Sequence, residues 1–217
     1  MKLKAILFDF DGVIAESVDV KTQAFGDLFR DDYPQYVEKI VAFHTANGGM
    51  SRYDKFRYFY KEIIQAPLSE EKFQELCRRF NALVMEKVIS ASLVAGAKEF
   101  LDKYHGRLPL YVISATPDEE MKEIIARKKL AGYFKGVFGA PRTKPEMIAA
   151  ILAQNGYAAQ EVIFLGDSVN DLKAAKQSGI RFAARVIKGK EAWADDDKVE
   201  TRFYNLKEFD GYINDRI

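Results

Sequence analysis

The stretch that decides the fold stands close to the N-terminus and reads Ala5-Ile6-Leu7-Phe8-Asp9-Phe10-Asp11-Gly12-Val13. Residues 5–10 form a short, largely apolar run, and this length suits a buried strand better than a helix. Two carboxylates, those of Asp9 and Asp11, lie at the end of this run. Because they lie two residues apart, both can point into one site at the end of a strand. The sequence therefore predicts a first strand with a pair of acids at its carboxyl end.

Similar short runs recur later in the chain, each rich in β-branched or aromatic residues. They cover residues 108–114, 136–138, 161–166 and 181–186. Apolar residues recur with helical spacing between them, over residues 93–104, 118–130, 145–154 and 168–178. Strands that alternate with helices of this length predict an α/β fold: a doubly wound, Rossmann-like parallel sheet with helices on both faces.

Residues 17–89 interrupt this alternation, because they contain no convincing buried strand. They are predicted to form helices over residues 21–30, 33–45, 52–64 and 69–88. We therefore expect a Rossmann-like core made of residues 1–16 and 90–217, with an α-helical domain, residues 17–89, inserted after the first strand.

The composition excludes several classes of protein. With 48% hydrophobic and 30% charged residues, the 217-residue chain is globular rather than disordered. A net charge of +1 argues against nucleic acid or an anionic membrane as the main partner. The single cysteine, Cys77, rules out an internal disulfide and fits a reducing compartment. No apolar run is long enough for a signal peptide or a spanning helix, so we expect a cytoplasmic protein, either a monomer or a homodimer.

Polar residues at the ends of the predicted strands form a candidate site, because ligands of open parallel sheets bind beyond those ends. Besides the two acids after the first strand, these residues are Ser114, Ala115, Lys144, Asp167, Ser168 and Asp171. Asp167 and Asp171 lie four residues apart, so both would fall on the first turn of one helix if that helix has begun by Asp167.

These residue types suggest phosphate chemistry with a metal. Clustered carboxylates repel one another unless a cation lies among them, and Mg²⁺ prefers such oxygen ligands. A lysine and a serine can bind the oxygens of an anion such as phosphate. An aspartate can attack phosphorus and form an aspartyl-phosphate. The sequence therefore predicts a small phosphorylated metabolite as substrate and Mg²⁺ as cofactor.

In order and spacing, four groups of residues resemble the four motifs of the haloacid dehalogenase (HAD) superfamily of phosphohydrolases. These groups are residues 9–13, Ser114, Lys144 and residues 166–171. The helical insertion resembles the cap of the superfamily's phosphoglycolate phosphatase and β-phosphoglucomutase-like branch, and the likeness covers nearly the whole chain. The resemblance implies a Mg²⁺-dependent hydrolase acting on phosphoric monoesters. Glu16-Ser17 stands where an Asp-Ser or Asp-Thr pair is commoner, which concerns the hinge rather than the core chemistry.

The resemblance also implies a role for each matching residue. Asp9 would be the nucleophile and a metal ligand. Asp11 would be the general acid and base, with its backbone carbonyl on the metal. The remaining roles would be metal binding by Asp167, phosphate binding by Gly12, Ser114, Ala115 and Lys144, and support by Ser168 and Asp171. The presence of Asp11 favours phosphate esters over carbon–halogen bonds, since an alkoxide leaving group needs an acid and a halide does not.

Within the insertion, Arg52 and Lys55 follow a loop with two glycines, at a helix start that Ser51 can cap. One hypothesis is that both cations recognise an anionic or hydroxylated part of the substrate. The alternative is that they are two solvated charges on a cap helix. His44, close to the same loop, is a further candidate for a substrate contact.

Three other functions remain open at this stage. A sugar-phosphate mutase of the β-phosphoglucomutase type would use the same aspartates but return the phosphoryl group to its substrate. A phosphonate hydrolase would need a cap lysine that forms a Schiff base, for which Lys21 and Lys55 are candidates only by default. A non-catalytic binding protein on this scaffold is disfavoured by the complete set of acids, lysine and serine.

Overall fold

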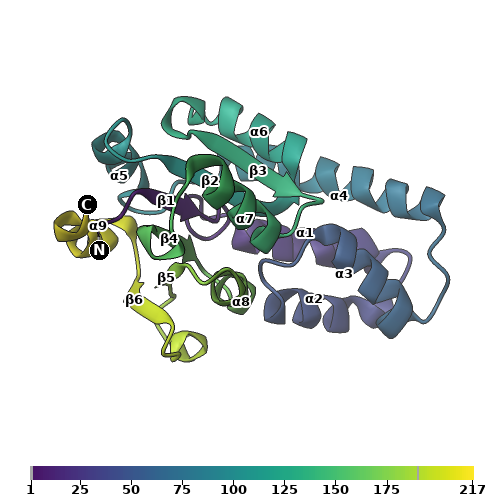
Figure 1. Ribbon diagram of the computed structural model, residues 1–217. Coiled ribbons are helices and arrows are strands. Elements are labelled where there is room, and N and C mark those ends of the chain that lie inside the picture. Colours follow the sequence, from purple (N-terminus) through teal and green to yellow (C-terminus); the bar gives the residue numbers. More distant parts are fainter. Residues whose placement is uncertain (1, 190) are drawn as a thin grey trace.

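The computed structural model describes residues 2–189 and 191–217 and is built on a parallel sheet (Figure 1). Within these residues the sheet has six strands in the order β3-β2-β1-β4-β5-β6. The strands are β1 (Ala5–Phe8), β2 (Leu110–Pro117), β3 (Gly136–Ala140), β4 (Val162–Gly166), β5 (Arg181–Arg185) and β6 (Val199–Phe203). The predicted doubly wound α/β fold is thus confirmed.

Helices cover both faces of the sheet, as the alternation of side chains along β1 requires. Ile6 and Phe8 point to one face and share a core with α5 (Ala97–Tyr104), α6 (Asp118–Arg127) and α9 (Leu206–Ile213). Ala5 and Leu7 point to the other face and share a second core with α7 (Lys144–Asn155) and α8 (Val169–Ser178). Since β1 is buried on both faces, every residue of its run is apolar.

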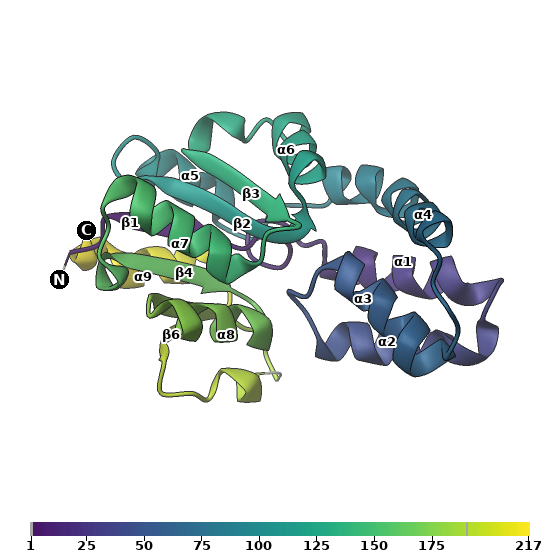
Figure 2. The ribbon, with the colours of Figure 1, turned by 45° about the vertical axis from the view of Figure 1, so that its right-hand side comes forward.

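Four helices lie beyond the carboxyl ends of the strands (Figure 2). They are α1 (Val18–Arg30), α2 (Val37–Ala46), α3 (Arg52–Tyr58) and α4 (Glu70–Ser90), and we call them the helical unit. A short 3₁₀ turn, Pro34–Tyr36, precedes α2, and a π-helical segment, Phe59–Ile64, continues α3. Aromatic rings fill the interior of the unit; the Phe25 and Phe80 ring centroids lie 4.4 Å apart.

Local sequence signals explain where several helices begin. The Ser51 side chain accepts a hydrogen bond from the Asp54 backbone N–H at 3.2 Å, which confirms the predicted cap of α3. Thr143 and Glu146 form a complete capping box at the start of α7, and Pro145 lies in its first turn as expected. These caps fix the start of α7 at Lys144, at the edge of the sheet where the candidate site lies.

Several predicted boundaries are wrong, and two elements were missed. β2 does not end at Ser114 but continues to Pro117, because it pairs with β3 again at Pro117 after a register shift. The helix predicted from residue 93 begins only at Ala97, since Gly96 precedes it with a positive φ of 81°. β6 and α9 lie beyond the last predicted strand. Among the described helices, none has the length and apolarity that a membrane crossing requires.

Candidate active site

The site lies at the carboxyl edge of the two central strands, where the strand order reverses and parallel sheets bind ligands. Asp9 follows β1 and Asp167 follows β4, and these strands are hydrogen-bonded neighbours. The Asp9 backbone N–H donates to the Leu165 carbonyl at 2.9 Å, which extends the pairing to the site itself. Two acids 158 positions apart in the sequence are thereby brought together.

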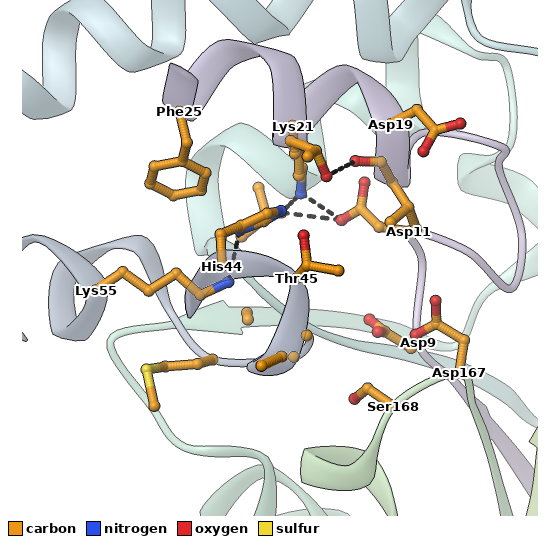
Figure 3. A pocket seen from close by; sticks show the side chains of 18 of the residues that line it. Asp9, Asp11, Asp19, Lys21, Phe25, His44, Thr45, Lys55, Asp167 and Ser168 are labelled. Carbon is orange, nitrogen blue, oxygen red and sulfur yellow. Dashed lines mark hydrogen bonds and ion pairs between the residues drawn. The ribbon is translucent and has the colours of Figure 1, made fainter. Parts of the chain in front are cut away.

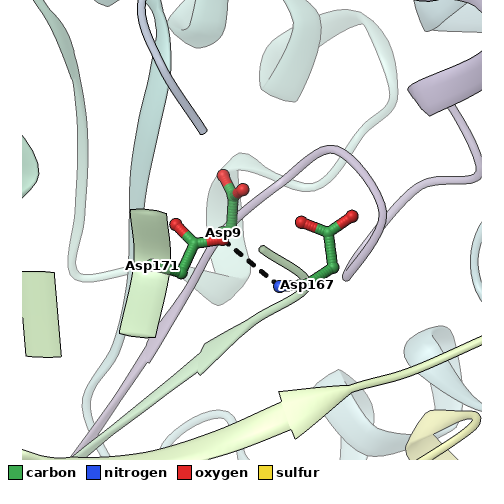
Figure 4. Close-up of side chains that lie close together, drawn as sticks. All are labelled: Asp9, Asp167 and Asp171. Carbon is green, nitrogen blue, oxygen red and sulfur yellow. Dashed lines mark hydrogen bonds between the residues drawn. The ribbon is translucent and has the colours of Figure 1, made fainter. Parts of the chain in front are cut away.

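Three carboxylates form a tight cluster at this edge (Figure 4). Asp9, Asp167 and Asp171 each contribute an oxygen, and these oxygens all lie within 4.8 Å of one another. Asp171 is fully buried, and Asp9 is 4% exposed. Oxygen donors at this spacing are the ligands that a hard divalent cation prefers, so the residues present fit a Mg²⁺ site.

Lys144, the first residue of α7, is the cation of this cluster. Its Nζ lies 3.0 Å from Asp9 Oδ2 and also contacts Asp171 Oδ1. Asp171 Oδ2 in turn accepts hydrogen bonds from the Asp167 backbone N–H at 3.2 Å and from Ser168 Oγ at 2.7 Å. The structure thus brings Lys144, Asp167 and Ser168 together around the carboxylate of Asp171.

The helix α8 has not begun by Asp167, so the condition for placing both acids on its first turn is not met. Ser168 has an extended backbone and caps α8, accepting a hydrogen bond from the Asp171 N–H, so the helix proper begins at Val169. Asp171 therefore lies in the first turn, whereas Asp167 precedes the cap. The carboxylates still converge because the Asp171 side chain reaches back to the Asp167 backbone.

Burial and the neighbouring negative charges set the protonation of the cluster. Burial raises the pKa of Asp9 to about 7, against the charge of Lys144, and the charges of Asp171 and Asp11 raise it further. Burial and the charge of Asp9 also raise the pKa of Asp167 well above its ordinary value. One lysine among three carboxylates leaves net negative charge that a bound cation would compensate.

Asp11 lies apart from this cluster and is held by the helical unit (Figure 3). Ser17 Oγ donates to Asp11 Oδ1 at 2.6 Å, and Lys21 Nζ, from α1, donates to Oδ2 and, at 2.7 Å, to Thr116 Oγ1. Burial acts to raise the pKa of Asp11, but the charge of Lys21 and the hydrogen bonds hold it below its ordinary value. Sequence reasoning gave these contacts of Lys21 and Thr116 no role. One signal was present, since Lys21 follows Ser17 by four residues, the spacing of one helix face.

Three residues predicted to bind phosphate lie around the acids. Ser114 is buried, and its Oγ accepts a hydrogen bond from the Thr116 N–H at 3.1 Å. Ser114 and Ala115 both line the cavity. Gly12 has a φ of +77°, and a Cβ at this position would lie 2.0 Å from Asp167 Oδ2. Only glycine therefore allows the loop after β1 to approach Asp167 this closely.

A cavity of about 530 Å³ separates the strand ends from the helical unit. Its walls include Asp9, Asp11, Ser114 and Asp167 on the sheet side, and Lys21, Phe25, His44, Gly49, Arg52 and Lys55 on the helical side. Asn170 Nδ2 donates to the Gly48 carbonyl at 2.6 Å, so the glycine loop between α2 and α3 contacts α8 at the wall of the cavity. A ligand in this cavity would contact both parts of the chain.

The two candidate cations of the helical unit are not solvated charges. Arg52 is 6% exposed and forms a bidentate ion pair with Glu120 of α6, at 3.2 and 2.5 Å. Lys55 is 2% exposed, and its Nζ lies 2.9 Å from His44 Nδ1. The reading of both residues as surface charges on a cap helix is therefore wrong.

Glu16, at the predicted hinge, has a clear partner. Arg185, the last residue of β5, contacts both Glu16 carboxylate oxygens, at 2.6 and 2.9 Å, and donates to the Gly12 carbonyl at 2.8 Å. This guanidinium ties the start of the helical unit to the loop after β1. Glutamate at position 16 is longer than the commoner aspartate, and its carboxylate reaches the Arg185 guanidinium. Nothing in the local sequence indicated this contact.

A doubly wound sheet with acids at the ends of its two central strands and helices over them defines a class of α/β hydrolases. The model of the haloacid dehalogenase-like hydrolase family matches residues 6–185, and the chain belongs to this family. Among curated proteins, a phosphoglycolate phosphatase of Vibrio parahaemolyticus is 28% identical over 193 residues, which span 82% of this chain and 81% of the relative. The predicted enzyme class, a HAD-family phosphatase, is confirmed.

Solved structures share the same fold. A protein assigned as a β-phosphoglucomutase of Bacteroides vulgatus aligns with a TM-score of 0.79 at 17% identity, covering 98% of this chain and 88% of that chain. YfnB of Bacillus subtilis, assigned as a HAD hydrolase and solved bound to magnesium, aligns with a TM-score of 0.71 at 16% identity, covering 99% and 100%. At these identities the likeness concerns the fold alone.

Proposed function

We propose that the protein is a Mg²⁺-dependent phosphatase that hydrolyses a small phosphomonoester through an aspartyl-phosphate on Asp9. The observation that carries this proposal is the buried contact of Asp9 with Lys144 beside Asp167 and Asp171, with a second acid, Asp11, held separately. A nucleophile and an acid–base group in different surroundings are what a two-step phosphoryl transfer needs.

In the first step, a carboxylate oxygen of Asp9 attacks phosphorus, and the bond from phosphorus to the alcohol oxygen breaks as Asp11 gives its proton to that oxygen. Lys144, Ser114 and nearby backbone N–H groups bind the phosphoryl oxygens, where negative charge develops. Water then attacks the same phosphorus and gives a proton to Asp11, which frees Asp9 and releases inorganic phosphate.

The contact between Asp11 and Lys21 bears on this cycle. With Lys21 bonded to it, Asp11 is ionised, which suits the step in which it takes a proton from water. The step in which it donates a proton requires Asp11 to leave Lys21. Since Lys21 belongs to α1, movement of the helical unit would change the proton affinity of Asp11.

The metal would be held by Asp9 and Asp167, with the Asp11 backbone carbonyl, and Asp171 would support Lys144 and the ligands. When bound, Mg²⁺ offsets the repulsion between the nucleophile and the phosphoryl oxygens. The donor chemistry of the cluster and the magnesium bound to YfnB support this assignment.

We also propose that residues 1–16 and 90–217 act as the catalytic core and residues 17–89 as a cap. The cavity between them, lined by both parts, supports this division. A cap that closes over the substrate would exclude water from the phosphoryl group until the second step. The mutase alternative is not favoured, since the curated relatives are phosphatases.

The test is phosphate release from a panel of small esters, with phosphoglycolate first because the curated relatives act on it by name. Reactions contain either Mg²⁺ or a chelator, and the Asp9→Asn variant is compared with Asp31→Asn, a change at an exposed aspartate. We expect turnover only with Mg²⁺, a loss of at least about 10³-fold in kcat for Asp9→Asn, and no such loss for Asp31→Asn. Full activity of Asp9→Asn would overturn the mechanism, and isomerised product without phosphate release would select the mutase.

A further inference from the structure

Lys55 differs from the other cations around the cavity. Lys144 and Arg52 are buried and each meets a carboxylate, and the partly buried Lys21 meets Asp11. Within residues 2–189 and 191–217, Lys55 forms no ion pair, although it is 2% exposed. Burying an ammonium without a counter-charge is costly, so this position requires an explanation.

The partner that Lys55 does have is an imidazole. Its Nζ lies 2.9 Å from His44 Nδ1, and the His44 ring lies against Phe25 with centroids 4.5 Å apart. Burial and the charge of Lys55 lower the pKa of His44 to about 3, so the ring is neutral near pH 7. Because an ammonium only donates, Nδ1 accepts from Lys55 and the ring proton is on Nε2. The pair thus presents N–H donors and no negative charge.

The pair faces the cavity opposite the acids. In Figure 3, Lys55 and His44 lie on one side, and Asp9, Asp167 and Ser168 lie on the other. A phosphate ester whose phosphorus lies at Asp9 would extend its alcohol part toward the helical unit. The group that reaches Lys55 therefore belongs to the leaving alcohol.

We propose that Lys55 and His44 form the subsite that binds a carboxylate on the leaving alcohol, so that the preferred substrates are phosphorylated hydroxy acids. This inference rests on the proposed phosphatase function. It adds the chemical group of the leaving alcohol that the helical unit recognises. A carboxylate would supply the counter-charge that Lys55 lacks and would accept its free N–H groups. A hydroxyl would supply no charge.

Arg52 has no part in this subsite. Its guanidinium is paired in bidentate fashion with Glu120 and lies over the Phe80 ring, 4.8 Å from the centroid. The hypothesis that both cations recognise the substrate is therefore kept for Lys55 only. Arg52 instead joins the helical unit to α6 through Glu120.

Two esters of similar size test the proposal in the wild-type protein. Phosphoglycolate carries the carboxylate, and 2-hydroxyethyl phosphate carries a neutral hydroxymethyl group in its place. We expect kcat/KM to favour phosphoglycolate by about 10- to 150-fold, the range of a hydrogen-bonded charge pair. If neither ester releases phosphate although other esters do, or if the neutral ester is as good, the subsite is refuted. If no ester is hydrolysed, the proposed function itself fails.

Variants assign the preference to Lys55. In Lys55→Met, KM for phosphoglycolate should rise until the preference is lost, while kcat/KM for the neutral ester changes less than about 3-fold. Lys39→Met, a change of an exposed lysine on α2, is the control and should keep the wild-type preference. An equal loss on both esters would show a structural role only and would overturn the proposal.

A pH profile of the wild-type protein gives a readout that does not depend on folding of a variant. Burial and the charge of Lys21 lower the pKa of Lys55 to about 7, with Asp11 opposing. The groups that face Lys55 are Lys21 of α1, His44 of α2 and Asp11 after β1, and all of them act on both esters. The ratio of the two kcat/KM values should therefore fall as pH rises through about 7. A constant ratio would contradict the assignment.

Discussion

In the metal-free protein, ionisation of Asp9 should lower the free energy of unfolding as pH rises. Replacing Asp9 by asparagine should remove this loss. Burial raises the pKa of Asp9 to about 7 in the folded protein, from an ordinary value of 3.8. Between these values the folded chain keeps a proton that the unfolded chain has released, so the free energy of unfolding falls as pH rises. The fall is about 1.4 kcal/mol per pH unit midway between the two pKa values and levels off near pH 7, so it amounts to about 2 kcal/mol between about pH 5 and 7.

Asp9→Asn removes this term while keeping a polar side chain beside Lys144. We therefore expect the variant to gain about 2 kcal/mol over the wild type between about pH 5 and 7, measured by urea unfolding with a chelator present. Two other groups change the free energy of unfolding in the same pH window. Burial lowers the pKa of His44, so its effect opposes that of Asp9, and burial raises the pKa of Asp167, so its effect adds to that of Asp9. His44 is present in both proteins, so its contribution cancels in the difference. The Asp167 contribution shrinks when the charge of Asp9 is removed, because that charge helps to raise the pKa of Asp167, and this adds to the gain of the variant.

The metal gives this prediction a second arm. Mg²⁺ at 100 times its dissociation constant should add about 2.7 kcal/mol to the wild type, and clearly less to Asp9→Asn, which has lost a charged ligand. Asp31→Asn, a change at an exposed site, should follow the wild type at every pH. A difference between Asp9→Asn and the wild type that does not change with pH would refute the reasoning, because Asp9 would then ionise normally in the folded state.

Two further predictions concern the joint between the helical unit and the sheet. Glu120→Gln should lower the free energy of unfolding in urea by about 3 kcal/mol, because Arg52 stays buried without its charged partner. Arg52→Met should lower it by only about 1 kcal/mol, because Glu120 is 20% exposed and water can reach it. Equal losses in the two variants would contradict this prediction. Gly49→Ala should lower kcat/KM about 10-fold, since its Cβ would lie 2.7 Å from Ser168 Oγ. Gly106→Ala has a similar positive φ but open space around it, so it should lose stability only.

The central strands and their acids were predictable because the deciding signals are local. The apolar run of β1 ends at an acid, and parallel strands bring their carboxyl ends to one edge. From these two facts the meeting of Asp9 and Asp167 follows without any knowledge of side-chain contacts. The strand β6 was missed because it lies at the sheet edge and alternates exposed and partly buried residues, so it lacks a continuous apolar run.

The contacts of the helical unit could not be predicted, because each depends on a partner far away in the sequence. Arg52 meets Glu120 across 68 positions, and Lys21 meets Thr116 across 95. A lysine or arginine on a helix has the same local pattern whether it ends in water, in an ion pair or in a cavity. Only the packing of the unit against the sheet decides that Arg52 and Lys21 form ion pairs and that Lys55 faces the cavity.

The difference among these three cations indicates how the two parts of the chain work together. Lys21 and Arg52 cross to carboxylates of the sheet side and hold the unit in place without a ligand. Lys55 has no such carboxylate, so on our proposal its counter-charge comes from the substrate. A substrate anion would then stabilise the arrangement in which the cavity is closed, and an ester without it would not. Selectivity for the acid and closure over the phosphoryl group would thus depend on the same ammonium.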